Sequence, residues 1–141
     1  MKKNLLLVVG TIFLLVTMFS GCEEQKGTTT DKDSKITLES EVVELTYASK
    51  EFIKDDQGTI IKVEVQYLFK NIANKDLEFY VTAEFYDKDG NLIFSSDPPK
   101  FFSLPDGYSE IGIGPANKIA YDGTYLMDVD HIVIKAVEVE S

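Results

Sequence analysis

Hydrophobic and polar residues alternate along two long stretches of the chain, one from Ile61 to Lys70 and one from Leu77 to Tyr86. The apolar positions of the first stretch are Ile61, Val63, Val65, Tyr67 and Phe69. Those of the second are Leu77, Phe79, Val81, Ala83 and Phe85. Alternation with period two is typical of β-strands that are buried on one face only. We therefore expect both apolar sets to face a core, and Lys62, Glu64 and Glu84 to face solvent.

Shorter extended runs surround these two stretches. A first strand is expected within Ile36–Ala48, with Val43, Leu45 and Tyr47 pointing inward. Later strands are expected around Leu92–Phe94, Phe101–Leu104, Tyr108–Ile113, Ile119–Met127 and His131–Val139. In the last of these, Ile132, Ile134 and Ala136 share one face. No stretch after residue 20 shows convincing helical periodicity.

Turn residues separate these runs. Asp55–Gly58 and Asp87–Asn91 are expected to form tight turns, with Gly90 placed for a positive φ. Pro98 and Pro99 interrupt an extended run because proline cannot donate a hydrogen bond to a sheet. The segment 71–76 suits either a wide hairpin or a crossover between two sheets.

Seven or eight short strands in one domain, over residues 36–141, predict an all-β fold. We expect an Ig-like antiparallel β-sandwich in which the two long strands lie in opposite sheets. The chain has no Trp and a single Cys, so the disulfide and tryptophan of antibody domains are absent. A small barrel is the alternative architecture.

The N-terminus has the pattern of a secretory signal peptide, which we expect to be helical. Lys2 and Lys3 precede an apolar run from Leu5 to Phe19. This run is short for a membrane-spanning helix, which needs about 20 residues. Ser20, Gly21 and Cys22 follow, and this sequence resembles the lipobox of prokaryotic lipoproteins. The resemblance implies removal of residues 1–21 and a diacylglyceryl thioether on Cys22, which would anchor the protein to the extracytoplasmic face of the cell membrane. An uncleaved signal anchor is the alternative.

Residues 22–35 contain no large apolar side chain and are expected to form a flexible tether behind the anchored Cys22. The chain carries 24 acidic and 14 basic residues, a formal net charge of −10. Such a charge repels nucleic-acid phosphates and anionic headgroups. A nucleic-acid partner is therefore not expected, and attachment to the membrane would rest on the lipid alone.

Two turn motifs resemble those of FxLYD-type domains, which are Ig-like modules of bacterial and archaeal secreted proteins and lipoproteins. Tyr86 and Asp87 match the end of the family motif, with Phe85 in place of its Leu. Asp89–Gly90 and the later Leu104–Gly107 turn also fit. The resemblance covers roughly residues 60–113 and implies an Ig-like fold without shared catalytic residues.

Candidate chemistry is sparse. His131 lies near Asp128 and Asp130, which is compatible with a base or a metal ligand, but the chain has no second His to complete a site. Asp87, Asp89 and Asn91 offer alternating oxygens for Ca²⁺, yet the spacing of an EF-hand loop is not met. We interpret these residues as a strand start and a hairpin turn, and predict no enzyme activity, cofactor or metal.

Exposed apolar side chains are the better candidates for a functional site. Leu68, Tyr80 and Tyr86 are expected on the outward faces of the long strands. Pro98, Pro99, Phe101 and Phe102 lie at a junction between a loop and a strand. Such a surface suits envelope proteins or peptides as partners. The sequence thus predicts a lipid-anchored binding or structural module; a secreted hydrolase or a Ca²⁺-dependent protein is the alternative.

Overall fold

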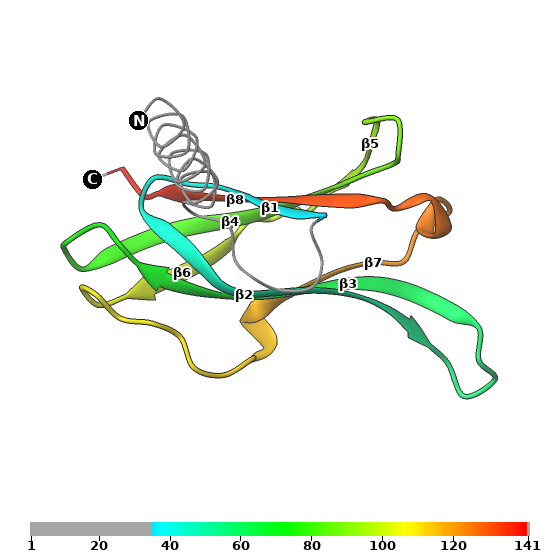
Figure 1. The fold of residues 1–141 in the computed structure, drawn as a ribbon, viewed down its shortest axis with the longest axis horizontal. Helices are drawn as coiled ribbons and strands as arrows, with labels where there is room; N and C mark the ends of the chain where they lie inside the picture. Colours follow the sequence, from blue (N-terminus) through cyan, green and yellow to red (C-terminus); the bar gives the residue numbers. More distant parts are fainter. Residues whose placement is uncertain (1–34, 141) are drawn as a thin grey trace, which may run out of the picture.

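The computed structural model describes residues 35–140 and has eight strands arranged in two sheets. The strands are β1 (Ile36–Glu39), β2 (Val43–Lys54), β3 (Ile60–Asn71), β4 (Leu77–Tyr86), β5 (Leu92–Ser95), β6 (Lys100–Leu104), β7 (Lys118–Tyr121) and β8 (His131–Glu138). Two 3-10 turns, η1 (Pro115–Asn117) and η2 (Leu126–Asp128), flank β7. Figure 1 shows the sheets as two layers. The protein is an all-β sandwich, as the sequence predicted.

One sheet has the order β1-β8-β4, with β5 and β6 both paired to the far edge of β4. The other has the order β2-β3-β7. The two long strands, β3 and β4, therefore lie in opposite sheets, and residues 72–76 form the crossover between them. Their apolar faces meet in the core, where the rings of Phe69 and Phe79 pack edge to face with centroids 5.5 Å apart.

One pairing departs from the antiparallel prediction. β1 and β8 run parallel, with Ile36 opposite Ile132 and Glu39 opposite Lys135. The cause lies in residues 36–48, which we expected to form a single strand. They form two strands in different sheets, because Ser40–Val42 carries the chain from β1 across the edge to β2. The Ser40 hydroxyl stabilises this corner by accepting the backbone N–H groups of Val42 and Val43.

Two inward-facing positions were predicted wrongly. In β2 the register shifts between Leu45 and Tyr47, so Ala48 is buried and Tyr47 is only half-buried. A bulge inserts one extra residue into a strand, so every later side chain points to the opposite face of the sheet. In β3 the buried set begins at Val63, and Ile61 is 46% exposed. Ile61 is the second residue of β3, next to the turn of the β2–β3 hairpin.

Two acidic residues on the outer faces are less exposed than predicted. Glu64 is buried, with its carboxylate 2.9 Å from the Gln66 amide nitrogen and 3.6 Å from the Lys62 ammonium. The side chain of Glu84 is only 13% exposed. Glu64 is covered by its neighbours two residues away on β3, and Glu84 by Lys135 on the adjacent strand β8. Long side chains can lie along the sheet surface while their polar ends stay in contact with the acids.

The stretch 108–113 was expected to be a strand and forms only an isolated bridge, between Ser109 and Lys70. Glu110 takes the place of a paired strand along this part of β3. Its backbone N–H donates to the Phe69 carbonyl, and its carboxylate accepts the Phe69 N–H at 2.8 Å. With the Tyr108 carbonyl, which accepts the Asn71 N–H at 2.9 Å, these two groups of Glu110 satisfy this part of the β3 edge. No alternation pattern in the sequence indicates such an arrangement. The neighbouring phenol of Tyr67 has a raised pKa, first because of burial and second because of the Glu110 carboxylate.

Candidate binding surface

Three exposed apolar side chains form a row across the outer face of the β1-β8-β4 sheet. Tyr80 on β4 lies opposite Phe101 on β6 and opposite Val137 on β8. The exposed fractions are 46% for Tyr80, 52% for Phe101 and 63% for Val137. The two rings pack edge to face with centroids 5.7 Å apart, which holds both side chains in place. We call Tyr80, Phe101 and Val137 the apolar row.

The other residues predicted for this surface are distributed differently. Pro98 and Pro99 are exposed between β5 and β6, close in sequence to Phe101. Phe102 is 6% exposed and belongs to the core, because neighbouring residues of a strand point to opposite faces. Leu68 is half-buried on the outer face of the other sheet, so it shares no surface with Tyr80.

Tyr86 is half-buried and lies among polar groups. Its ring stacks on the His131 imidazole with centroids 5.2 Å apart and planes at 5°. Its hydroxyl donates to the Glu84 carboxylate at 3.1 Å, and the Lys135 ammonium lies 2.5 Å from the same carboxylate. Lys135, and then Tyr86, hold the pKa of Glu84 below its usual value. Tyr86 therefore belongs to a polar cluster that joins β4 to β8.

This cluster predicts a pH dependence of stability. Because the pKa of Glu84 is lowered in the folded protein, its ion pair stabilises the fold above the unfolded pKa of Glu, about 4.3. The contribution is lost as the pH falls through the folded pKa. Urea unfolding of the protein and of Glu84→Gln should therefore give a difference in free energy that shrinks from about pH 6 to about pH 3. A difference independent of pH would contradict this role of the Glu84 charge.

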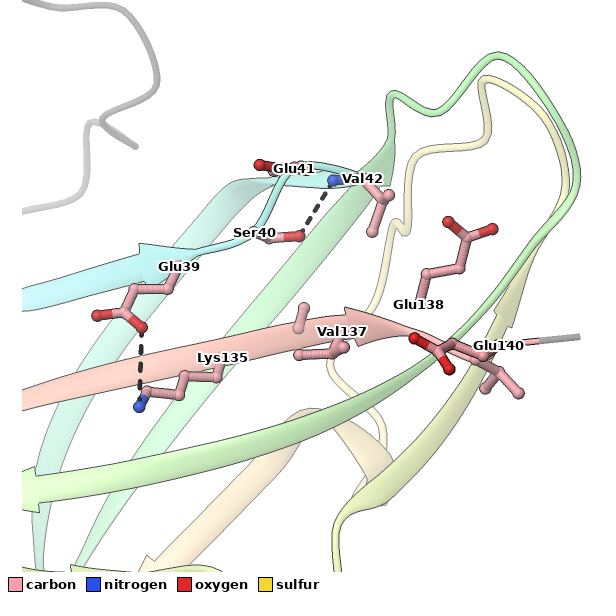
Figure 2. Close-up of a pocket in the computed structure, with 10 residues that line it drawn as sticks. Glu39, Ser40, Glu41, Val42, Lys135, Val137, Glu138 and Glu140 are labelled. Atoms are coloured by element: carbon pink, nitrogen blue, oxygen red, sulfur yellow. Dashed lines mark hydrogen bonds and ion pairs between the residues drawn. The ribbon is translucent and has the colours of Figure 1, made fainter.

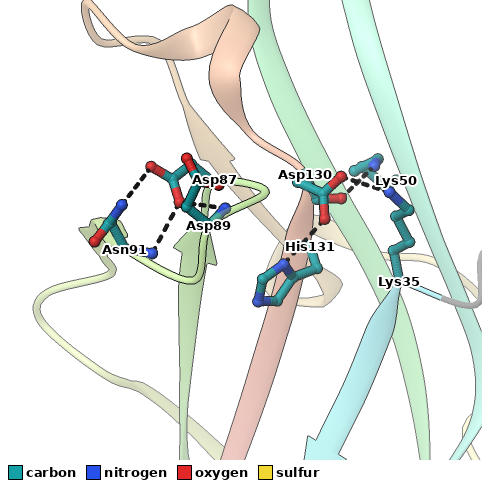
Figure 3. A network of polar contacts seen from close by, with 7 residues as sticks. All are labelled: Lys35, Lys50, Asp87, Asp89, Asn91, Asp130 and His131. Carbon is teal, nitrogen blue, oxygen red and sulfur yellow. Dashed lines mark hydrogen bonds and ion pairs between the residues drawn. The ribbon is translucent and has the colours of Figure 1, made fainter.

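His131 and Asp130 belong to a set of polar contacts at one end of the sandwich. The His131 Nδ1 atom lies 3.1 Å from the Asp130 carboxylate, which also accepts a hydrogen bond from the Lys35 ammonium (Figure 3). The Lys50 ammonium donates to the Asp130 backbone carbonyl at 2.9 Å. Lys35, and then His131, lower the pKa of the Asp130 carboxyl. These contacts connect the start of β1, β2 and β8 at one end of the sandwich.

Asp87 closes the hairpin turn between β4 and β5. Its carboxylate accepts the backbone N–H groups of Asp89 and Asn91 and the side-chain amide of Asn91 (Figure 3). These bonds, those from Asn91 first, lower the pKa of Asp87. Gly90 has a φ of 83°, as the turn prediction required. The prediction of a hairpin turn is confirmed, and the Asp87 carboxylate makes these hydrogen bonds within the turn.

A groove of about 920 Å³ opens at the edge of the same sheet, where β1 ends and β8 continues (Figure 2). Residues 39–42 form one side and residues 135–140 the other. Val137, the end of the apolar row, also lines this groove. We call it the edge groove. Sequence reasoning missed it because its two sides are brought together by the parallel β1–β8 pair, which joins residues nearly a hundred positions apart.

Glutamates at alternate positions were the one sequence signal of the edge groove. Glu39 and Glu41 lie on one side, and Glu138 and Glu140 lie on the other. Lys135 is the single basic residue of the lining; its ammonium is 3.8 Å from Glu39 and also pairs with Glu84. Glu138 pairs with Lys75 on the crossover. The groove is therefore strongly acidic along both sides.

Within residues 35–140, no group of three or more His, Cys, Asp and Glu side chains is arranged to hold a metal ion. No helix in this part of the chain is long and apolar enough to cross a bilayer. Cys22, the predicted lipidation site, lies outside the described residues, as do the signal peptide and most of the tether.

No protein-family model matches the chain, and no curated protein matches it. The resemblance to FxLYD-type domains therefore stays a prediction. A solved structure that is similar is the crystal structure of Cj0090 from Campylobacter jejuni, with a TM-score of 0.45 and 16% sequence identity. The match covers 74% of this chain and 99% of that chain.

Proposed function

We propose that this protein is a prokaryotic lipoprotein that displays a non-catalytic Ig-like β-sandwich outside the cytoplasmic membrane and acts by contact with envelope proteins or peptides. Lys2 and Lys3, the apolar run to Phe19 and the Ser-Gly-Cys sequence ending at Cys22 support the anchor. A diacylglyceryl group supplies the two chains that stable anchoring needs, at about 0.8 kcal/mol per buried methylene.

The apolar row is the observation that supports action by contact. Two aromatic rings and a valine, from three adjacent strands, are about half exposed on one sheet face. Aromatic side chains that keep a fixed position while exposed are the usual anchors of protein interfaces. The residues that first suggested chemistry have structural partners instead: His131 stacks on Tyr86, and Asp87 holds its own turn.

Replacing the predicted lipidation site tests the anchor. The full chain should take up a fatty-acid label and sediment with membranes, whereas Cys22→Ser should lose the label and either leave the membrane or remain an unprocessed precursor. The control is Cys22→Ser combined with Ser34→Cys, which returns a thiol outside the lipobox and should not regain the label. An intact mass of the wild-type protein that still includes Met1 would contradict the proposal.

A further inference from the structure

Part of the β8 backbone has no neighbouring strand on the side that faces the edge groove. The Ile132 N–H donates to the Lys35 carbonyl on the β1 side, and the Val139 N–H donates to the Glu78 carbonyl on the β4 side. Because backbone groups alternate along a strand, even-numbered residues of β8 direct theirs toward β1. β1 ends at Glu39, opposite Lys135. The C=O of Ala136 and both backbone groups of Glu138 therefore point into the groove.

The corner that follows β1 does not pair with these backbone groups of β8. Residues 40–42 turn toward β2, and the Val42 carbonyl accepts the Ile72 N–H at 3.0 Å. Among the residues that the structure describes, none from this corner forms a backbone hydrogen bond with Ala136 or Glu138. An unpaired strand edge is a template for a strand from another chain. An extended segment can therefore occupy the position beside β8 that β1 would have taken if it had continued.

The charges beside this open edge favour a basic segment. Glu41 and Glu140 are exposed and form no ion pair within residues 35–140, so both remain available. Together with Glu39 and Glu138, they give the groove lining four carboxylates, compared with the single ammonium of Lys135. Figure 2 shows the Glu138 and Glu140 carboxylates at the end of β8, beyond the Glu39–Lys135 pair. Opposite charges across an interface raise the association rate and exclude partners of like charge.

We infer that the edge groove binds an extended segment of a partner protein, rich in Lys or Arg, which adds to β8 as a strand. Binding at the edge groove thus rests on the contact function proposed above and specifies the chemistry of the partner. The backbone of Glu138 supplies hydrogen bonds, and the glutamates pair with the basic side chains. The apolar row begins at Val137, so a segment that leaves the groove over the outer face meets Tyr80 and then Phe101.

A second copy of this chain does not suit the site. Two such edges placed together would bring both sets of glutamates face to face, and the chain as a whole has a net charge of −10. Like charges brought together at an interface oppose association. The partner is therefore a different protein with an exposed basic strand or tail.

The probe for the test is a short peptide of alternating Lys and Val, with capped ends, added to the full chain in detergent micelles at low salt. Two control peptides separate the contributions: one with Glu in place of Lys, and one with the Lys-Val sequence in alternating L and D residues. The second keeps the charge but does not form a regular added strand. Binding is followed by titration calorimetry, and the edge itself by hydrogen exchange of the Glu138 amide.

The Lys-Val peptide should bind saturably and slow the exchange of the Glu138 amide, whereas neither control peptide should. Glu41→Lys combined with Glu140→Lys should weaken binding by about tenfold or more, since like charges then face the peptide. Glu51→Lys with Asp56→Lys is the matched control: both residues are exposed outside the groove and the net charge changes equally. That variant should bind nearly as the wild type does.

The inference is overturned by absence of binding, by equal binding of the heterochiral peptide, by unchanged Glu138 exchange, or by equal losses in the two variants. Equal heterochiral binding would show attraction by charge alone. These outcomes are independent of the lipidation test, because the calorimetry uses purified protein whether or not Cys22 carries lipid.

Discussion

Phe102→Ala is expected to lower the free energy of unfolding by about 3–5 kcal/mol, whereas Phe101→Ala lowers it by less than about 1 kcal/mol. The two residues are neighbours on β6 and undergo the same chemical change. Phe102 is 6% exposed, and its ring lies 5.3 Å from that of Phe79, 5.7 Å from Phe69 and 6.2 Å from Tyr67. Its removal leaves a cavity among three aromatic rings that the opposite sheet cannot close.

Phe101→Ala lowers the free energy of unfolding far less, because the Phe101 ring is 52% exposed and packs mainly against Tyr80. Urea unfolding followed by circular dichroism gives both values. Domains of this kind typically have a total stability of about 5–15 kcal/mol, so Phe102→Ala should leave a substantial unfolded population while Phe101→Ala stays folded. Equal losses of unfolding free energy in the two variants would show that the register of β6 on β4 is different from the one described here.

Period-two alternation predicted most of this fold because a one-sided sheet imposes that period directly. The inward set of β4 was predicted residue by residue: Phe79, Val81 and Phe85 are all 0% exposed. In β8, Ile132 and Ile134 were predicted to share one face, and both are 0% exposed. Pro98 and Pro99 also marked the break between β5 and β6, which pair with the same side of β4. Local rules suffice where each strand keeps a regular register.

Most of the failures depend on how a strand pairs with a distant part of the chain. The bulge after Leu45 moved Ala48 inward, and no turn residue marks it. Glu84 was expected to face solvent, but Lys135 on β8 covers it. Glu64 is different, because its partners Lys62 and Gln66 are two residues away on its own strand. A cross-strand partner such as Lys135 becomes visible only when strand order and register are known.

The candidate site was predicted in part for the same reason. Tyr80 and Phe101 were identified as exposed, but their pairing across β4 and β6 required the register. The parallel β1–β8 pair that creates the edge groove had no local signal at all. Two glutamates at the end of one strand and two near another are ordinary surface residues until the fold places them on the two sides of one groove.

Asn71→Asp is expected to destabilise the fold by roughly 3 kcal/mol or more at pH 7, and by less in acid. Asn71 is 1% exposed, and its amide nitrogen donates to the carbonyls of Lys75, Leu104 and Pro105 at 2.7–3.0 Å. Its amide oxygen accepts the Ala73 N–H at 2.8 Å. One side chain thus fixes the β3–β4 crossover against the turn after β6.

An aspartate at this position keeps the shape but sets a carboxylate oxygen against three carbonyls. Burial and these dipoles should raise the pKa of the new carboxyl above its unfolded value of about 3.9. An acid with a raised folded pKa is tolerated best below the unfolded pKa, and stability is lost as the pH rises. The difference in unfolding free energy from wild type should therefore be smaller at about pH 3.5 than at about pH 7.

Asn74→Asp is the matched control, since Asn74 lies in the same crossover, is exposed and has a φ of 59°. Aspartate tolerates this left-handed backbone conformation nearly as well as asparagine does. Its effect should stay within about 0.5 kcal/mol and change little with pH. If the two aspartate variants unfold alike at both pH values, the three hydrogen bonds of Asn71 do not hold the sandwich together, and the crossover is fixed by burial of Leu77 and Phe69 alone.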